Sequence, residues 1–403
     1  MTARRVALVT DRFPPNWGGG VATAHYQLYR LLRKRGFDVR VFSCFDEGAG
    51  QGNRIDIVRR AASHGMIRVV RRAARIGFAA VEPGRAAYQT ADVVVRVLGA
   101  FGLRRPLRAF DPDIAIFPDH GAPAMVLPTD RRCRRVLVLH HDPMRFVDLP
   151  LVEPHSRLDA RLAAVAGQRV LKAIDRTVAP SSYMNAAFAS TYRFSGSREI
   201  APLVIDAAYL AEIPLDNPRS RLGLGPDAPL IYVPGGGNKF KGASLVPEIL
   251  TALGPRATGP IGVYVSGAVT ADVRDKLASL PASVRLHLPG PVDGPRNLAV
   301  VRTCTFGVYP TLTENYSMAL LEAALLDVPM VTFDVGGNAE IVRDGINGYL
   351  APAYDVAAMI DRATALLDAT AARSMAAATR ADATARLGEA ARGQRLIDAL
   401  TRF

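Results

Sequence analysis

Cysteine is scarce in this chain of 403 residues, and long apolar runs are absent. The three cysteines, Cys44, Cys133 and Cys304, are scattered and lack CxxC spacing, so neither a disulfide framework nor a zinc site is indicated. No window holds about 18 uninterrupted apolar residues, which argues against a helix that spans a membrane. The first residues run straight into a strand-like segment and are too short for a signal peptide. We therefore expect a cytoplasmic protein, either soluble or peripheral at a membrane.

Acidic residues are in deficit, with 37 Asp and Glu against 50 Lys and Arg, a net charge of +13. The excess is uneven, because residues 54–108 hold twelve arginines and three acids. Two stretches in this segment, 67–81 and 88–110, can be drawn as helices whose arginines interrupt apolar stripes. Interfacial helices that bind anionic lipid have this pattern, and so has an arginine-rich solvated face. Peripheral membrane contact through residues 54–108 is therefore one of two alternatives.

The length exceeds what one ordinary core supports and suits two domains of roughly 150 to 200 residues. Short strand-like segments alternate with helix-like stretches in both halves, at residues 6–10, 113–117 and 135–141, then at 230–234, 261–265, 284–288 and 305–309. This alternation predicts an α/β fold with doubly wound parallel sheets. We expect an N-terminal Rossmann-like domain at residues 1–205 and a C-terminal one at 222–375, with a linker rich in Pro and Gly at 213–229.

Two glutamates lie close together in the second half of the chain. Pro310 closes an apolar run, so Glu314 falls on a loop at the carboxyl edge of a strand, where open α/β sheets bind ligands. Glu322 lies in an apolar helix expected to begin at Tyr316 or Ser317, and a carboxylate buried there needs a partner. Sugar or ribose hydroxyls would serve. From the residues alone, a loop acid at a helix start and a solvated helix face are equally good explanations.

Glycines mark two further strand ends. Residues 18–20 are three glycines before a helix expected from Val21 to Gly36, which leaves backbone amides facing a ligand or serves only a flexible turn. The GxGxxG spacing of a dinucleotide site is absent. Residues 235–237 are again three glycines, and Lys239 and Lys241 beside them either neutralise a diphosphate or are solubilising surface lysines.

Acidic and imidazole side chains follow two strands of the first half. Asp119 and His120 follow one strand, and His140, His141 and Asp142 stand at the end of the next. Because neighbouring residues on a strand point to opposite faces, at most one of the adjacent histidines can face a cleft. A zinc site needs more ligands than this edge offers. We expect a histidine that donates or accepts a hydrogen bond in the site.

The order Glu314, seven residues, Glu322, then DVPMV, DVGGNAEIV and DGINGYLAP resembles the signature of the retaining GT-B glycosyltransferases of family four. The resemblance spans essentially the whole chain and is strongest over residues 230–355. It implies two Rossmann-like domains facing each other across a cleft, with a final helix at 376–403 that packs back towards the N-terminal domain. It also implies that Glu314 lies beside the hydroxyls of the transferred sugar and Glu322 on the nucleotide ribose.

The same resemblance extends to other motifs. PPNWGGG is similar to the family's glycine loop at the donor phosphates, and HHDP matches the family's histidine through His141, or through His140 if the register slips by one. The family supplies an arginine and a lysine five residues apart. Lys241 fits the lysine, but the arginine position holds Gly236, so Lys239 would have to stand in. Residues 203–204, Leu and Val, replace the family's Asn-Gly turn.

These motifs predict a catalytic set of Glu314, Lys241 and His141 or His140. The expected donor-binding residues are Gly19, Gly20, Gly236, Gly237, Lys239, Lys241, Asn315, Tyr316, Ser317, Met318 and Glu322. The implied activity moves a sugar from a nucleoside diphosphate sugar to an acceptor hydroxyl with retained configuration, with no metal or other cofactor and no nucleic-acid partner. A small-molecule or natural-product acceptor is the first expectation. A lipid-linked or polysaccharide acceptor at a membrane surface, a nucleotide-sugar epimerase and a non-catalytic binding protein are the alternatives.

Overall fold

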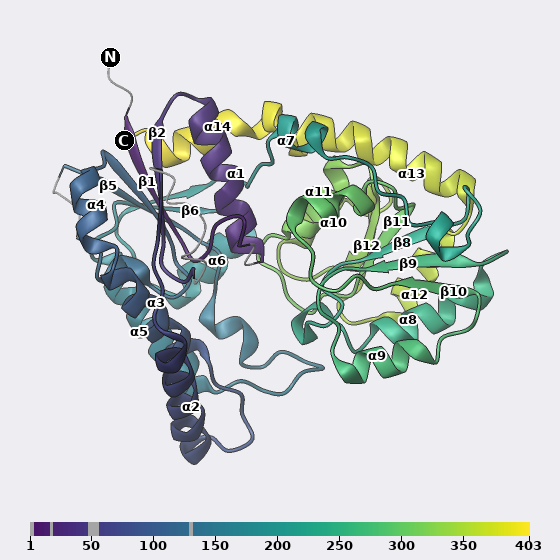
Figure 1. Ribbon diagram of the computed structural model, residues 1–403, viewed down its shortest axis with the longest axis horizontal. Coiled ribbons are helices and arrows are strands. Elements are labelled where there is room, and N and C mark those ends of the chain that lie inside the picture. The colour runs from purple at the N-terminus through teal and green to yellow at the C-terminus, as the bar shows by residue number, and fades with distance from the viewer. Residues whose placement is uncertain (1–3, 17–18, 47–55, 129–131) are drawn as a thin grey trace. The chain divides into compact units, whose positions relative to one another are not determined.

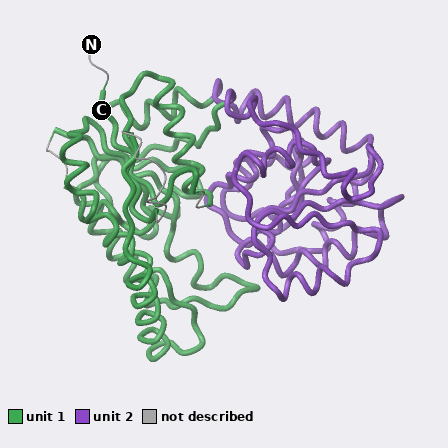
Figure 2. Tube along the Cα trace, in the orientation of Figure 1, with its two compact units in different colours: residues 1–206, 392–403 green, residues 207–391 purple. Residues whose placement is uncertain are grey.

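Parallel strands organise both halves of the chain. The computed structural model describes residues 4–16, 19–46, 56–128 and 132–403. The chain divides into two compact units: unit 1 comprises residues 1–206 and 392–403, and unit 2 comprises residues 207–391 (Figure 2). The break after residue 206 lies one residue beyond the expected end of the first domain at 205.

Unit 1 contains a parallel sheet of seven strands in the order β3-β2-β1-β4-β5-β6-β7 (Figure 1). The strands are β1 (Arg5–Thr10), β2 (Asp38–Ser43), β3 (Ile57–Arg59), β4 (Ile114–Pro118), β5 (Arg134–Val138), β6 (Arg176–Ala179) and β7 (Ser197–Ile200). The order reverses between β1 and β4. Loops at the carboxyl ends of the strands on either side of such a reversal diverge and leave room for a ligand.

Helices cover both faces of this sheet. On one face lie α1 (Gly20–Lys34) and the end of α14 (Glu389–Thr401), where Leu28 and Leu396 pack with Val136 of β5. The other face is covered by α3 (Gln89–Phe101), α4 (Arg104–Phe110), α5 (Arg157–Leu171) and α6 (Ser182–Thr191), and Leu137 of β5 belongs to that core. Consecutive residues of β5 therefore enter different cores.

The arginine-rich segment of unit 1 is helical, with differences from expectation. α2 (His64–Val81) is capped by Ser63, whose hydroxyl accepts a hydrogen bond from Met66 N, and it extends away from the sheet of its unit (Figure 1). The stretch 88–110 forms α3 and α4 in place of one helix, because a turn at Gly102 lets the buried Leu103 and Leu107 reach the same core. β3 was not expected, since three residues are too few to show a periodicity.

Unit 2 contains a second parallel sheet, of six strands in the order β10-β9-β8-β11-β12-β13. The strands are β8 (Leu230–Val233), β9 (Ile261–Val265), β10 (Val284–His287), β11 (Phe306–Tyr309), β12 (Met330–Phe333) and β13 (Gly348–Ala351). The order reverses between β8 and β11. The loops after these two strands contain the three glycines with the lysines and the first of the two glutamates.

Helices surround this second sheet as well. They are α7 (Ala207–Glu212), α8 (Val246–Leu253), α9 (Ala271–Ala278), α10 (Gly294–Val301), α11 (Met318–Leu325), α12 (Val356–Ala365) and α13 (Ala369–Asp382). The expected linker at 213–229 belongs to unit 2, because the Arg219 guanidinium donates to the carbonyls of Thr303 and Ala228 at 2.8 Å each. Arg219 lies in a segment whose composition is typical of a linker, but its hydrogen bonds hold that segment against unit 2.

The C-terminal segment is divided between the units. Residues 376–391 stay with unit 2, and only residues 392–403 join unit 1. A π-helical turn at Ala383–Leu387 separates α13 from α14, and Arg386 in it donates to the carbonyls of Glu340 at 2.7 Å and Ile341 at 2.6 Å. The final helix that was expected from residue 376 is therefore interrupted, and its packing against unit 1 begins later in the chain.

Candidate functional site

The loop after β11 holds Glu314 in a fixed position. The residue is 7% exposed, and its carboxylate accepts hydrogen bonds from Lys241 Nζ and Tyr309 OH. Burial, with the neighbouring Glu314 as the next cause, raises the pKa of Tyr309 well above its usual value, so this hydroxyl stays a donor. Glu314 is the loop carboxylate that the sequence predicted, and two donors orient it before any ligand arrives.

A glycine turn fixes the backbone of the same residue. Gly337 N donates to Glu314 O at 3.1 Å, and Gly336 next to it has a φ of +58°. A Cβ at Gly336 would lie 1.8 Å from that same carbonyl oxygen. Only glycine combines this dihedral with so close an approach. The DVGG motif therefore serves to clamp the loop that carries Glu314.

The lysines follow β8 in a short 3₁₀ turn, Lys239–Lys241. The Phe240 carbonyl accepts from Leu312 N at 3.0 Å, which joins this turn to the loop after β11. Lys241 thereby reaches Glu314 and lies 5.6 Å from the centre of the Tyr309 ring. Lys239 points differently, with its ammonium 5.3 Å from the centre of the Phe240 ring. The structure thus brings Lys241 to Glu314 and leaves Lys239 beside an aromatic ring.

Gly236, at the position of the family's arginine, is enforced by packing. A Cβ there would lie 2.0 Å from Val265 Cγ1, and the Gly236 amide donates to Ser266 O at 3.1 Å. Gly237 is equally confined, since its Cβ would lie 1.9 Å from Ala268 O. The space at the arginine position is consequently filled by Val265 in this backbone.

Glu322 lies on α11, whose first turn is capped by Ser317 Oγ accepting from Leu320 N at 3.3 Å. The residue is half-buried, and burial raises the pKa of its carboxyl group from an ordinary 4.5 to about 8. No charged neighbour contributes to this shift, in contrast to the ion pair at Glu314. A carboxyl in such a place is stabilised by a ligand that supplies hydroxyl groups.

The residues between the two glutamates are less open than expected. Asn315, Tyr316, Ser317 and Met318 are each between 2% and 8% exposed. The Ser317 hydroxyl caps the helix. A ligand at this helix start would therefore bind the backbone amides of Ser317 and its neighbours. The predicted side-chain contacts of these residues to a donor stay a prediction.

The glycine loop of unit 1 leads directly into α1. Gly18 lies outside the described residues, whereas Gly19 caps the helix with a φ of +87° and Gly20 is its first residue. Both are exposed, and within the described part of the chain no side chain caps this helix start. Binding of an anion at the amides of Gly19 and Gly20 stays a prediction.

The two adjacent histidines point to opposite sides. β5 ends at Val138, and His140 Nε2 lies 3.0 Å from His25 Nε2 of α1, while His141 Nε2 lies 3.1 Å from Gln89 Oε1 of α3. Burial lowers the pKa of His140 to about 4 and that of His141 well below its usual value, so both imidazoles are neutral at pH 7. The two rings contact different helices although neither histidine lies on the strand, and the expectation that at most one of them faces a cleft stays a prediction.

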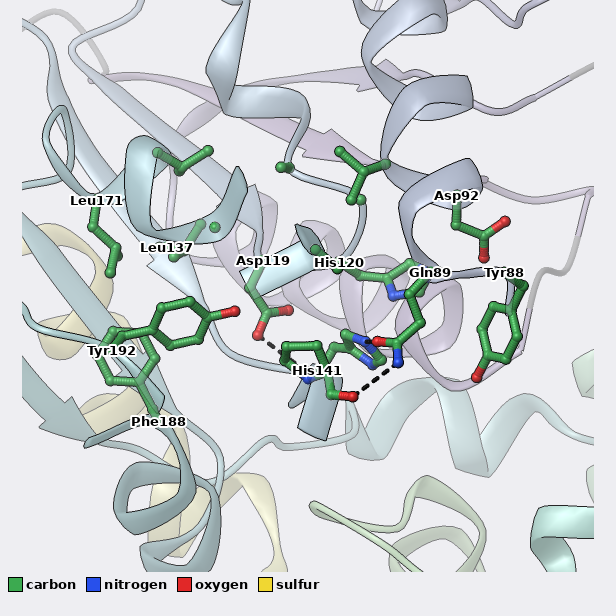
Figure 3. Close-up of a pocket in the computed structure, with 17 residues that line it drawn as sticks. Tyr88, Gln89, Asp92, Asp119, His120, Leu137, His141, Leu171, Phe188 and Tyr192 are labelled. Carbon is green, nitrogen blue, oxygen red and sulfur yellow. Dashed lines mark hydrogen bonds between the residues drawn. The ribbon is translucent and has the colours of Figure 1, made fainter. Parts of the chain in front are cut away.

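His141 lines a pocket at the carboxyl ends of β4 and β5 (Figure 3). Asp119 lies beside it and accepts hydrogen bonds from the backbone amides of His140 at 2.9 Å and His141 at 3.0 Å. Burial raises the pKa of Asp119 to about 7 against the opposing effect of these donors. His120 is next to them, its ring centre 5.0 Å from that of His141.

Sequence reasoning missed His25, Gln89 and Tyr309. His25 and Gln89 lie far in the sequence from the histidines that they contact, whereas Tyr309 lies five residues before Glu314 and carries no motif of its own. In each case a side-chain hydrogen bond in the structure reveals the residue. Among the described residues, no group of three or more His, Cys, Asp or Glu side chains is placed to hold a metal ion. In the same part of the chain, no helix has the length and apolar character needed to cross a membrane.

Comparison with known proteins identifies both units. Residues 18–208 match the family described as Glycosyltransferase Family 4, and residues 241–369 match Glycosyl transferases group 1. The D-inositol 3-phosphate glycosyltransferase 1 of Catenulispora acidiphila is 26% identical over 349 residues, 83% of this chain and 82% of that protein. Sucrose-phosphate synthase from Thermosynechococcus elongatus has a TM-score of 0.72 at 16% identity, over 98% of this chain and 97% of its own. HepE from Anabaena, in complex with UDP and glucose, has a TM-score of 0.68 at 14% identity, over 99% and 100%.

Proposed function

We propose that this chain, which belongs to the group 1 glycosyltransferases of family four, moves a sugar from a nucleoside diphosphate sugar to an acceptor hydroxyl and retains the anomeric configuration. The observation that carries the proposal is the convergence of Lys241 and Glu314 where the strand order of unit 2 reverses. Glu322 follows on the helix that starts from the same loop. UDP in the HepE complex supports a uridine nucleotide as the first donor to test.

Each residue has a distinct part in the proposed reaction. Lys241 neutralises the charge that grows on the departing diphosphate, a contact that strengthens in the transition state. Glu314 accepts hydrogen bonds from the sugar, and Glu322 pairs with the ribose hydroxyls. The neutral His141 supplies or accepts one further hydrogen bond. No metal is required for these roles, and independence from metal stays a prediction.

Retention is proposed to come from positioning. A double displacement needs a carboxylate that attacks the anomeric carbon, with a second carboxylate about 5 Å away. Glu314 already accepts hydrogen bonds from Lys241 and Tyr309, which makes it a poor nucleophile. Departure of the diphosphate and attack by the acceptor on one face of the sugar would retain the configuration without a covalent intermediate.

The direct test is a donor panel of UDP-, GDP- and dTDP-sugars with Glu322→Ala beside the parent protein. We expect the variant to bind its donor more weakly by on the order of 1–3 kcal/mol, because hydrogen bonds to the ribose are lost. Titration calorimetry gives the affinity, and NMR of the product gives its anomeric configuration. Glu248→Ala, an exposed glutamate of α8, is the matched control. Equal donor affinity in a folded Glu322→Ala protein would contradict the role, and an epimerised sugar in place of a glycoside would contradict the reaction.

Glu322 also offers a readout that needs no donor. Its pKa is about 8 when folded, against an ordinary 4.5, so between these values the folded protein holds a proton that the unfolded chain has released. Stability should therefore fall as the pH rises from about 5 to about 8, by on the order of 1–3 kcal/mol from this group. Glu322→Gln should flatten that slope in urea unfolding. An unchanged slope would show that Glu322 is well solvated and does not await a ligand.

An acceptor at a membrane surface is the second candidate, and α2 is the observation that favours it. Val69 is 67% exposed and Ile76 is 56% exposed, and seven residues apart they share one face of the helix. Arg68, Arg72 and Arg75 are exposed on the neighbouring face. Basic and apolar residues in this arrangement suit an anionic bilayer, where each arginine contributes about 1 kcal/mol.

Liposome flotation separates the two acceptor classes. If the acceptor is lipid-linked, the protein should float with anionic vesicles at low salt and be released as salt rises. Val69→Asp with Ile76→Asp should then abolish flotation, whereas Leu215→Asp, an equally exposed apolar residue of unit 2, should leave it unchanged. Absence of flotation at low salt would exclude the membrane candidate and favour the small-molecule acceptor.

A further inference from the structure

The pocket beside His141 lies entirely within unit 1 and is apolar at one end. Leu137 of β5, Val170 and Leu171 of α5 and Phe188 of α6 line it, together with the ring of Tyr192. Gln89, Asp92 and Tyr88 stand at the opposite end, with Asp119 and His141 between (Figure 3). Gly167 leaves room for the Tyr192 ring, since a Cβ there would lie 2.8 Å from the tyrosine hydroxyl.

Gln89, Asp92 and Asp119 of this pocket already have partners in the protein. Gln89 donates to Pro143 O at 2.8 Å and its carbonyl oxygen meets His141, while Asp119 accepts two backbone amides. Asp92 pairs with Arg71 at 3.2 Å and Arg96 at 3.4 Å. No lysine or arginine is among the described residues that line the pocket. An anionic ligand would therefore meet carboxylates, and Arg71 and Arg96 behind the walls are already paired with Asp92.

The walls also select the occupant. The pocket has about 580 Å³ of empty space, open solvent at its mouth included. A flat ring or an alkyl chain would displace water from the apolar walls. An inositol ring, with a hydroxyl on every carbon, would bring polar groups that these walls do not match.

We infer that this pocket receives the apolar part of an uncharged, hydroxyl-bearing acceptor, and so selects a different class from the inositol phosphate in the name of the Catenulispora relative. This assignment rests on the proposed function, because only a transferase binds an acceptor. Asp119, Gln89 and His141 stand where the apolar walls end, so an acceptor hydroxyl would lie among hydrogen-bonding groups while its ring or chain fills the slot.

Filling the pocket tests this assignment. Val93 of α3 lines the pocket, whereas the next residue, Val94, is 39% exposed. Titration calorimetry would use 2-naphthol as a flat, uncharged probe and myo-inositol 1-phosphate as the anionic one. The parent and Val94→Phe should bind 2-naphthol alike, and Val93→Phe should bind it about tenfold more weakly or worse. Inositol phosphate should bind weakly, with the same affinity in the parent and in both variants.

A second pair guards against misfolding. Ala163 lines the pocket from α5, and Val165 is 53% exposed on the same helix. Ala163→Leu should repeat the loss of 2-naphthol binding and Val165→Leu should not, with thermal unfolding recorded for all four variants. The inference would be overturned if both pocket variants bound 2-naphthol as tightly as the parent protein does. It would also be overturned if inositol phosphate bound more tightly than 2-naphthol and Val93→Phe removed that binding.

Donor binding and product formation separate this inference from the proposed function. UDP binding measured in parallel should be the same in all four variants, because the substitutions lie in unit 1. Binding of 2-naphthol that depends on Val93, without a glycoside from any donor, would overturn the transferase proposal and support an apolar site. Glycoside formation on polar acceptors only, at rates that Val93→Phe leaves unchanged, would overturn the inference and keep the transferase proposal.

Discussion

Lys241→Ala should lower kcat about 10² to 10³-fold while nucleotide affinity falls by far less, because a preorganised cation contributes most when charge develops on the leaving group. The Lys241 ammonium donates to Glu314, which is itself buried. A diphosphate that arrives at the same ammonium would share it with this carboxylate. The lysine is therefore in place before the reaction and needs little reorganisation.

Steady-state kinetics and titration with free UDP measure the two effects separately. Lys239→Ala is the matched control, since that ammonium lies over the Phe240 ring, and it should change kcat by less than about tenfold. Removing Lys241 also leaves a buried carboxylate with Tyr309 as its one remaining side-chain donor in the described structure, which should reduce stability by about 1–3 kcal/mol. An equal loss of UDP affinity and of turnover would reduce Lys241 to a binding contact.

Gly236→Ala should destabilise unit 2 by about 1–3 kcal/mol, as overpacking of a core does. The added methyl would lie 2.0 Å from Val265 Cγ1, and Val265 is fully buried. Gly236→Arg should be worse in stability and should not speed turnover, although this slot aligns with the family's arginine. The reason is steric, since Gly236 is not among the glycines with a positive φ.

A double-mutant cycle isolates the contact. In a Val265→Ala background the nearest remaining atom to the added methyl is Val265 Cβ at 3.5 Å, so Gly236→Ala should then cost little. Gly259→Ala, where a Cβ meets nothing within 4 Å, is the control. Urea unfolding of the four cycle members gives the coupling free energy. A fully additive cycle would show that the backbone yields at Gly236 and that the packing does not enforce glycine there.

The strands near the cores were the most predictable features. Residues 230–233, 261–265 and 306–309 were located within a residue of their observed bounds, because buried parallel strands form short β-branched runs that the chain interrupts with glycine or proline. The two Rossmann-like units and the family were confirmed on the same basis. Breaks in helices that result from packing could not be predicted from the sequence in this way. The turn at Gly102 and the π-helical turn at Ala383–Leu387 depend on which core each apolar residue reaches.

The sequence by itself determined which chemical groups lie at the ends of which strands: Glu314 after β11, the lysines after β8, and the histidines after β5. Spacing along the chain is enough for this, since strand ends in a parallel sheet meet at one edge. Only the tertiary structure decided what each group pairs with. Lys241 and Glu314 are 73 positions apart in the sequence, and His141 and Gln89 are 52 apart, separations over which no local periodicity carries information. The same holds for Gly236, whose lack of a side chain is set by a valine on the neighbouring strand β9.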